Sequence, residues 1–236
     1  MTNHAVLIGL LIFFAAAAAF VLLHSKGEQL VNRNKPKPDL ADPAKWTIGP
    51  IVNGENDSVN MPLHPGPGML IDFATPSSEP HYVTVDYGSL AGKTRIIMRF
   101  KYEGGPILSR DGTAPATVCL YVQRVFDDWR AIDSDPYKDS DTESYRWFAT
   151  PNSVTLTAPG EYEIIASNSD LWTALIYSES QGAPPKGKPE AFKKAWDNAN
   201  AVGFVFGGGT SDTAGWGHGA KAQQPAKITI TIFDVG

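Results

Sequence analysis

The chain has 236 residues, a formal net charge of −5, one cysteine and 42% hydrophobic residues, which is ordinary composition for a globular protein. The mild acidity argues against a nucleic-acid partner, because no basic stripe is available to neutralise phosphates. The single cysteine, Cys119, excludes an intrachain disulfide framework, and its apolar strand context favours a structural thiol. With 22 glycines, 18 prolines and few long helical patterns, the composition favours β structure.

The chain begins with an apolar segment. Residues 5–23 carry no charged side chain and are about long enough to cross a bilayer as a helix. A secretory signal peptide is the alternative, with Ala17 and Ala19 at the small positions of a cleavage site. The apolar run continues past Ala19 and no lysine or arginine precedes it, so we favour an uncleaved anchor over residues 1–24.

The charges around this segment leave its orientation open. Lysines and arginines follow it, while only His4 and the terminal amine precede it, so the positive-inside rule places the domain in the cytoplasm. A secreted or exported β-sandwich with an aromatic-rich surface argues for the opposite orientation. We expect a membrane-anchored or secreted protein with its domain outside the cytoplasm, and we keep the cytoplasmic orientation as the alternative.

A polar, proline-containing stretch over residues 25–45 is typical of a semi-rigid linker. The folded domain is therefore expected over residues 46–236. Short apolar or alternating segments bounded by turn residues predict its strands. These segments cover residues 69–74, 82–87, 94–102, 117–125, 153–157, 161–166, 173–177, 202–206 and 228–235.

One helix is expected over residues 189–200, where Phe192, Ala195, Trp196 and Ala199 fall on one face. Trp196 on that face and Trp172 at the start of a strand are expected in the core. Closely spaced strands with one short helix predict an all-β fold. We expect a two-sheet jelly-roll β-sandwich, preceded by the N-terminal hydrophobic helix.

Alternation within two strands predicts a candidate ligand face. In residues 94–102 the apolar side chains share one face and Arg99 lies on the other. In residues 117–125 the same period of two separates Tyr121 and Gln123 from the apolar valines and leucine. If the two strands are neighbours in one sheet, Arg99, Tyr121 and Gln123 form an outward polar surface with an aromatic ring. A solvated sheet face without a ligand is the alternative.

Loop aromatics supply a second candidate site. Trp216 and His218 stand in the glycine-rich run of residues 215–219, and Trp129 follows a predicted strand. Flat rings stack on the C–H faces of sugars while polar neighbours bond the hydroxyls. These three residues therefore form a candidate carbohydrate site, and burial in the core is the alternative for any single tryptophan. Further aromatic candidates are Tyr137, Tyr145 and Trp147.

Several segments resemble galactose-binding-like β-sandwich modules. Residues 88–93 with the strand of residues 94–102 are similar to the second-quarter hairpin of that fold. Residues 172–177, the helix-like run of residues 192–196, and residues 202–209 and 230–235 resemble its second half, so that the resemblance covers about residues 46–236. Such modules bind glycans without cleaving them, and the resemblance therefore implies a non-catalytic carbohydrate-binding module.

The same resemblance implies a structural calcium ion. Asp234 stands at the acidic position near the end of the last strand, and Glu55 or Asp57 would supply an oxygen from the early part of the domain. Calcium binds about six to eight oxygens. The sequence departs from the family pattern because Asp234 is alone and Val235 follows it. An exposed aspartate near the chain end is the alternative.

The sequence contains no recognised catalytic motif. The five histidines are scattered, and the acid-rich residues 133–143 lack the spacing of an EF-hand, which favours a solvated loop. We therefore expect a non-enzymatic protein that binds carbohydrate at a cell or envelope surface. A structural or assembly protein of an envelope or virion is the main alternative, and a hydrolase of unrecognised type is the third.

Overall fold

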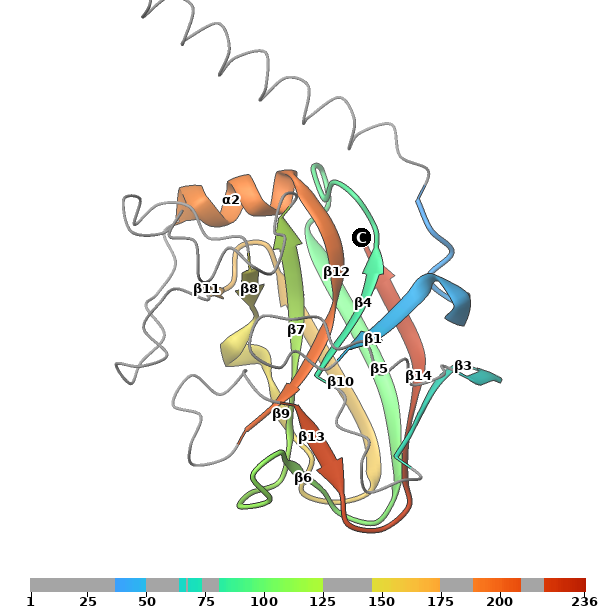
Figure 1. The fold of residues 1–236 in the computed structure, drawn as a ribbon. Helices are drawn as coiled ribbons and strands as arrows, with labels where there is room; N and C mark the ends of the chain where they lie inside the picture. Colours follow the sequence, from blue (N-terminus) through green and yellow to red (C-terminus); the bar gives the residue numbers. More distant parts are fainter. Residues whose placement is uncertain are drawn as a thin grey trace, which may run out of the picture. The chain divides into compact units, whose positions relative to one another are not determined.

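The computed structural model describes residues 37–49, 64–66, 68–73, 81–124, 146–174, 189–208 and 219–236. They lie in one compact unit, Lys37–Gly236. This described part is all-β, with antiparallel sheets and one short α-helix (Figure 1). The apolar residues 5–23 lie outside it, and none of the helices within it has the length and apolar character to cross a membrane.

The larger sheet contains seven of the described strands, all paired antiparallel. Their order across the sheet is β1 (Trp46–Gly49), β4 (Tyr82–Asp86), β12 (Ala199–Gly207), β7 (Thr117–Arg124), β8 (Arg146–Phe148) and β11 (Thr173–Ala174). The remaining strand, β9 (Val154–Thr155), pairs with the first residues of β7. The two long strands β7 and β12 therefore form the centre of this sheet.

The second sheet contains five described strands, also antiparallel. Their order is β10 (Gly160–Ser167), β5 (Arg95–Gly104), β14 (Ala226–Val235), β3 (Gly68–Asp72) and β2 (His64–Gly66). A small pair is formed by β6 (Ile107–Ser109) and β13 (Ala220–Ala222). The helix is α2 (Pro189–Asp197), and the 3-10 turns are η1 (Pro43–Lys45) and η2 (Thr150–Asn152).

The two larger sheets pack in a sandwich-like arrangement through aromatic side chains. Trp46 of the first sheet meets Phe233 of the second edge-on, with ring centroids 4.9 Å apart. Phe206 meets Phe73, which directly follows β3, at 5.8 Å. All four side chains are at most 9% exposed. The core therefore lies between the sheets, and α2 lies at the end of the sandwich where β7 ends and β12 begins (Figure 1).

Each predicted strand overlaps an observed one, although residues 74, 125 and 175–177 lie outside the described part. Alternation in residues 94–102 is confirmed, because apolar side chains of β5 are buried and the charged ones are exposed. The strands that the sequence did not predict are β1, β2, β6, β8 and β13, each of three or four residues. Runs that short do not complete an alternating pattern, and β2 also contains a proline.

The helix ends earlier than predicted, at Asp197 rather than residue 200. The loop between β4 and β5 supplies groups that bond its last carbonyls. Ser89 Oγ donates to Asp197 O at 2.6 Å, and the backbone N–H of Leu90 donates to Trp196 O at 3.1 Å. Because these tertiary bonds satisfy the open end of the helix, the chain can turn at Asn198 and enter β12 at once.

The compact unit begins at Lys37, so it includes the end of the stretch expected as linker. Lys37 Nζ donates to Ser89 O at 2.5 Å and lies 4.2 Å from the centre of the Tyr87 ring. The indole N–H of Trp46 donates to Leu40 O at 3.2 Å. Residues 37–45 are therefore attached to the sandwich ahead of its first strand.

Candidate functional site

The structure does not bring together the predicted face of Arg99, Tyr121 and Gln123. Arg99 is on β5 in the second sheet, whereas Tyr121 and Gln123 are on β7 in the first. Arg99 is exposed and pairs with Glu163 on the adjacent strand β10. The expectation of one shared surface is therefore wrong.

The outward exposure expected for Tyr121 and Gln123 is also wrong, because they are 0% and 6% exposed. The Tyr121 ring packs against Phe148 of the adjacent strand β8 at 5.2 Å and against Tyr82 of β4, on the far side of β12, at 5.0 Å. Its hydroxyl donates to Gln123 Oε1 at 3.1 Å, which satisfies both polar groups inside the protein. This side of β7 consequently behaves as core rather than as a binding face.

Most of the other predicted site residues lie outside the described part of the chain. These are Trp129, Trp216 and His218 of the loop site, Glu55 and Asp57 of the calcium site, and the additional aromatics Tyr137 and Tyr145. Trp147 is described and is only 1% exposed, so the prediction that it offers a ring to a ligand is wrong.

The calcium prediction stays untested. Asp234 is exposed on β14, and within the described residues no three histidine, cysteine or acidic side chains are grouped to hold a metal ion.

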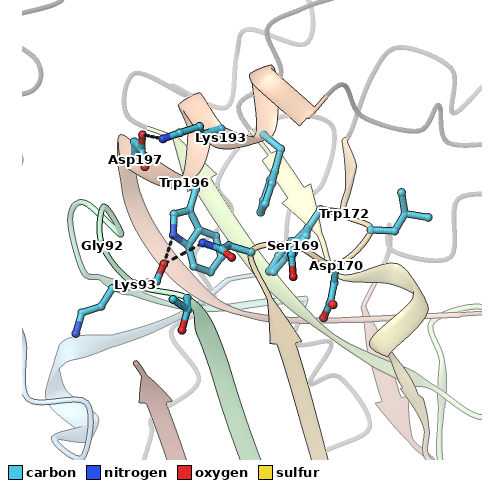
Figure 2. Close-up of a pocket in the computed structure, with 12 residues that line it drawn as sticks. Gly92, Lys93, Ser169, Asp170, Trp172, Lys193, Trp196 and Asp197 are labelled. Atoms are coloured by element: carbon cyan, nitrogen blue, oxygen red, sulfur yellow. Dashed lines mark hydrogen bonds and ion pairs between the residues drawn. The ribbon is translucent and has the colours of Figure 1, made fainter.

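A pocket of about 660 Å³ lies between α2 and two loops at the end of the sandwich (Figure 2). One loop, residues 87–94, joins β4 to β5, and the other, residues 168–172, joins β10 to β11. We call this cavity the α2 pocket. It is lined by Gly92, Lys93, Thr94, Asn168, Ser169, Asp170, Leu171, Trp172, Phe192, Lys193, Trp196 and Asp197.

Three aromatic rings form an apolar wall of the α2 pocket. Phe192 and Trp196 are four residues apart and therefore share a face of α2, toward Trp172 from the loop. Trp172 stacks on Phe192 at 5.0 Å and meets Trp196 edge-on at 5.8 Å. Both tryptophans are 2% exposed, so the prediction that they belong to the core is confirmed. The same aromatic cluster therefore packs the end of the sandwich and forms one side of the pocket.

Hydrogen bonds from this cluster hold the two loops in position. The indole N–H of Trp196 and the side-chain amide of Asn168 both donate to Lys93 O, each at 3.1 Å (Figure 2). The indole N–H of Trp172 donates to Ser167 O at 2.8 Å. Since both indole groups bond backbone carbonyls, they anchor the loops and leave the polar contacts with a ligand to the exposed side chains at the rim.

Two carboxylates line the α2 pocket, and both are engaged. Asp170 Oδ2 accepts from the backbone N–H of Ser167 at 2.7 Å and from Asn152 Nδ2 at 3.2 Å. Asp197 Oδ2 pairs with Lys193, one turn earlier on α2. Around them Asn168, Ser169 and Leu171 are exposed, with Leu171 at 47%. The rim therefore combines hydroxyl, amide and aliphatic groups that a ligand can reach.

Sequence reasoning missed this pocket because its walls come from three distant segments. The available signal was the polar run Asn168, Ser169, Asp170 shortly before the aromatic residue Trp172, combined with the aromatic face of the predicted helix.

The single cysteine lies away from the pocket, and burial raises the pKa of the Cys119 thiol well above its usual value. Cys119 is thus held as a neutral thiol in the core, as its apolar strand context predicted.

The chain matches no family model, and no curated protein was found to be similar to it in sequence. Evidence on function therefore comes from the geometry of the chain itself.

Proposed function

We propose that this chain is a non-catalytic binding module that takes a carbohydrate in the α2 pocket. The observation that carries the proposal is the pairing, in one cavity, of a rim of exposed hydroxyl, amide and aliphatic groups (Ser169, Asn168 and Leu171) with an aromatic floor whose rings are at most 7% exposed. A sugar ring has apolar C–H faces and hydroxyl edges, so it needs both kinds of surface. At about 660 Å³ the cavity also falls in the range of about 300–1,000 Å³ that is usual for small-molecule sites.

The surroundings of the pocket support binding rather than glycoside cleavage. Cleavage of a glycosidic bond ordinarily uses two carboxyl groups, one on each side of the bond. In the α2 pocket Asp170 accepts two hydrogen bonds from its own loop and η2, and Asp197 is paired with Lys193. Asp170 therefore holds its own loop in place, and Asp197 forms a solvent-exposed ion pair within α2.

The fold assignment that goes with this function is a galactose-binding-like jelly roll, and it is part of the proposal. Its support is the sandwich-like packing of two antiparallel sheets, with loops gathered at the end that holds α2. Loops on a rigid scaffold are where binding sites are usually built. The structural calcium ion and the position outside the cytoplasm remain proposals of the same kind.

A retention experiment tests the proposed function. The purified full-length chain is passed over a broad panel of immobilised polysaccharides, together with the variants Ser169→Trp and Ile165→Trp. Ser169 is exposed at the rim, so the new indole should fill the pocket, whereas Ile165 is exposed on β10 outside the pocket lining. We expect retention on at least one glycan, lost in Ser169→Trp and kept in Ile165→Trp. Retention that survives Ser169→Trp would reject the α2 pocket as the site, and failure on every glycan would reject carbohydrate binding.

A specific observation favours the second candidate function, a structural or assembly protein. Ile165 and Ile232 are 44% and 40% exposed; Ile97 on β5 pairs with Ile165, and Ile232 lies diagonally from Ile97, opposite Arg99. They form an apolar strip on the outward side of the second sheet, which protein contacts could cover. If this strip is an interface between copies, sedimentation of the parent chain should show an oligomer that Ile165→Asp dissociates.

A further inference from the structure

Strand β10 forms one edge of the second sheet. It lies beside β5, its one partner among the described strands, and pairs with it in a regular register over Gly160–Ser167 (Figure 1). An edge strand turns the backbone N–H and C=O groups of every second residue away from its partner. Because β10 contains no proline and no register shift, these groups form a continuous row along the free side of the strand.

Hydrogen bonds beside the strand identify the residues that face the free edge. Directly after β10, the backbone N–H of Asn168 donates to Thr94 O at 2.8 Å, in the same register as the strand pair. The even-numbered residues of β10 are therefore the ones that bond β5, because bonded residues alternate along an antiparallel pair. The residues whose backbone groups face the free edge are Glu161, Glu163, Ile165 and Ser167.

Side chains close one half of this edge. Asp170 Oδ2 accepts from the Ser167 N–H at 2.7 Å, and the indole N–H of Trp172 donates to Ser167 O at 2.8 Å. Asn152 Nδ2 donates to Ile165 O at 2.7 Å. These bonds occupy groups that an added strand would need, so the Ser167 end of the edge is closed to pairing.

The other half of the edge is open. Within the described part of the chain, no group bonds the edge-facing N–H and C=O of Glu161 and Glu163, or the N–H of Ile165. The side chains of all three residues are exposed, with Ile165 at 44%. We call these three residues the open edge. It offers backbone donors and acceptors beside side chains that a partner can contact.

The side chains of the open edge define what a partner strand should carry. Glu163 already pairs with Arg99 on β5. Glu161 has no ion-pair partner in the described part of the chain, since Lys101 opposite it on β5 pairs with Glu103 at 2.8 Å. The exposed Ile165 side chain is apolar. A partner therefore gains most from a basic side chain opposite Glu161 and an apolar one opposite Ile165.

Charge argues against a second copy of this chain as the partner. If two copies paired antiparallel through their open edges, glutamates of the two strands would lie opposite each other. Like charges directly opposite each other destabilise a strand pair. A strand with a basic residue at that position would instead form a cross-strand ion pair with Glu161.

We propose that the open edge of β10 binds an extended basic segment of another protein, which adds to the second sheet as an antiparallel strand. The segment carries an apolar residue opposite Ile165 and, four positions later, a lysine or arginine opposite Glu161. Main-chain hydrogen bonds to Glu161 and Glu163 supply the affinity, and the two side-chain positions supply the preference. This site is separate from the α2 pocket and does not depend on carbohydrate binding.

Two labelled peptides test the inference by fluorescence anisotropy with the full-length chain in detergent. The first has the sequence Thr-Val-Thr-Thr-Thr-Lys-Thr, and the second has glutamate in place of lysine. We expect saturable binding of the lysine peptide and about two- to fivefold weaker binding of the glutamate peptide, as suits an exposed ion pair. Glu161→Lys should reverse this preference, because the charge opposite the variable residue changes sign.

A matched pair of variants tests whether the edge itself is the site. Glu163→Pro removes the central N–H of the open edge and leaves the bonds to β5 intact, because that N–H faces away from β5. Glu163→Ala removes the same carboxylate and keeps the N–H. We expect peptide binding to be lost in Glu163→Pro and kept within about twofold in Glu163→Ala. Thermal unfolding of both variants checks that they are folded.

Methylated peptides make the same test on the unaltered protein. An N-methyl group on the central threonine, opposite Glu163, should abolish binding, whereas one on the threonine after it, whose N–H points away from β10, should be tolerated. Absence of binding by the lysine peptide, or binding that survives both Glu163→Pro and the central N-methyl group, would overturn the inference. Equal affinity for the two charged peptides would overturn the basic partner. An oligomer of the parent chain that Glu163→Pro dissociates and Glu163→Ala does not would assign the edge to a second copy and overturn it as well.

Discussion

The outward faces of the two sheets differ, although the sequences of their central strands alternate in similar ways. On β5 the outward side chains Arg99 and Lys101 are exposed. On β7 the outward side chains Tyr121 and Gln123 are buried, like the inward ones. Alternation therefore predicts which side chains share a face, but it does not predict whether that face meets water.

The chemistry of the two faces accounts for the difference. On the open face charged neighbours form exposed pairs, as Arg99 does with Glu163, and these pairs keep their contact with water. On the covered face the rings of Tyr82, Tyr121 and Phe148 pack side by side. One face is thus a solvated charged surface and the other is an extension of the core.

The largest expected effect is the loss of a ring from the covered face. Tyr121→Ala should lower the free energy of unfolding by about 3–5 kcal/mol, because it removes a fully buried ring and leaves a cavity. Lys101→Ala on the open face should change it by less than about 0.5 kcal/mol. Equilibrium unfolding in urea measures both. A loss under about 1 kcal/mol for Tyr121→Ala would show that the β7 face is not part of the core.

A smaller loss is expected where two strands of the covered sheet approach closely. Gly203 lies between Thr84 and Tyr121, and a Cβ there would overlap Val83 O and lie 2.9 Å from Thr84 Cα. Gly203→Ala should therefore destabilise the protein by about 1–3 kcal/mol. Gly160→Ala on β10, where the nearest atom is Tyr162 Cε2 at 3.9 Å, serves as the matched control and should be nearly neutral in thermal unfolding. Equal effects of the two changes would contradict the close approach.

Removing one buried hydroxyl should lower the free energy of unfolding by about 1 kcal/mol. Tyr121→Phe keeps the ring and deletes the donor to Gln123 Oε1, which is then left buried without that partner. Tyr162→Phe deletes a solvent-exposed hydrogen bond to Ala158 O and should lower the free energy of unfolding by a smaller amount. The two variants are compared by urea unfolding at the same pH. A larger loss for Tyr162→Phe would contradict the burial of the hydrogen bond between Tyr121 and Gln123.

The smallest effect is expected for the ion pair of the open face. A double-mutant cycle on Arg99→Ala and Glu163→Ala should give a coupling of about 0.2–1 kcal/mol that fades in high salt. The combination of Arg99→Ala with Glu103→Ala is the control, since Glu103 pairs with Lys101. A coupling above about 2 kcal/mol for Arg99 and Glu163 would mean that this face is shielded from water.

The long strands and α2 could be predicted because their patterns are local. The partner of each strand could not, since β5 and β7 follow each other closely in sequence yet lie in different sheets. The α2 pocket could not be predicted for the same reason, because its wall segments become adjacent only after the sheets have formed. Each wall segment by itself is an ordinary loop or an ordinary amphipathic helix.

A register irregularity on β14 is a second feature that the alternation of apolar residues does not predict. Simple alternation would put Ile232 on the same side as Ile230, in the core. The irregularity between these two residues turns Ile232 outward and directs Phe233 against Trp46. Bulges of this kind change the direction in which side chains point, and no distinctive sequence marks their position.

The attachment of Lys37 has a mechanical consequence. If the residues before it are held at a membrane, any pull on the domain enters at Lys37 and is passed to the loop through Ser89 O. The next element to carry the load is β1, a four-residue strand whose one partner among the described strands is β4. Because Ser89 also bonds the last turn of α2, tension would reach the pocket wall before it reached the centre of the sandwich.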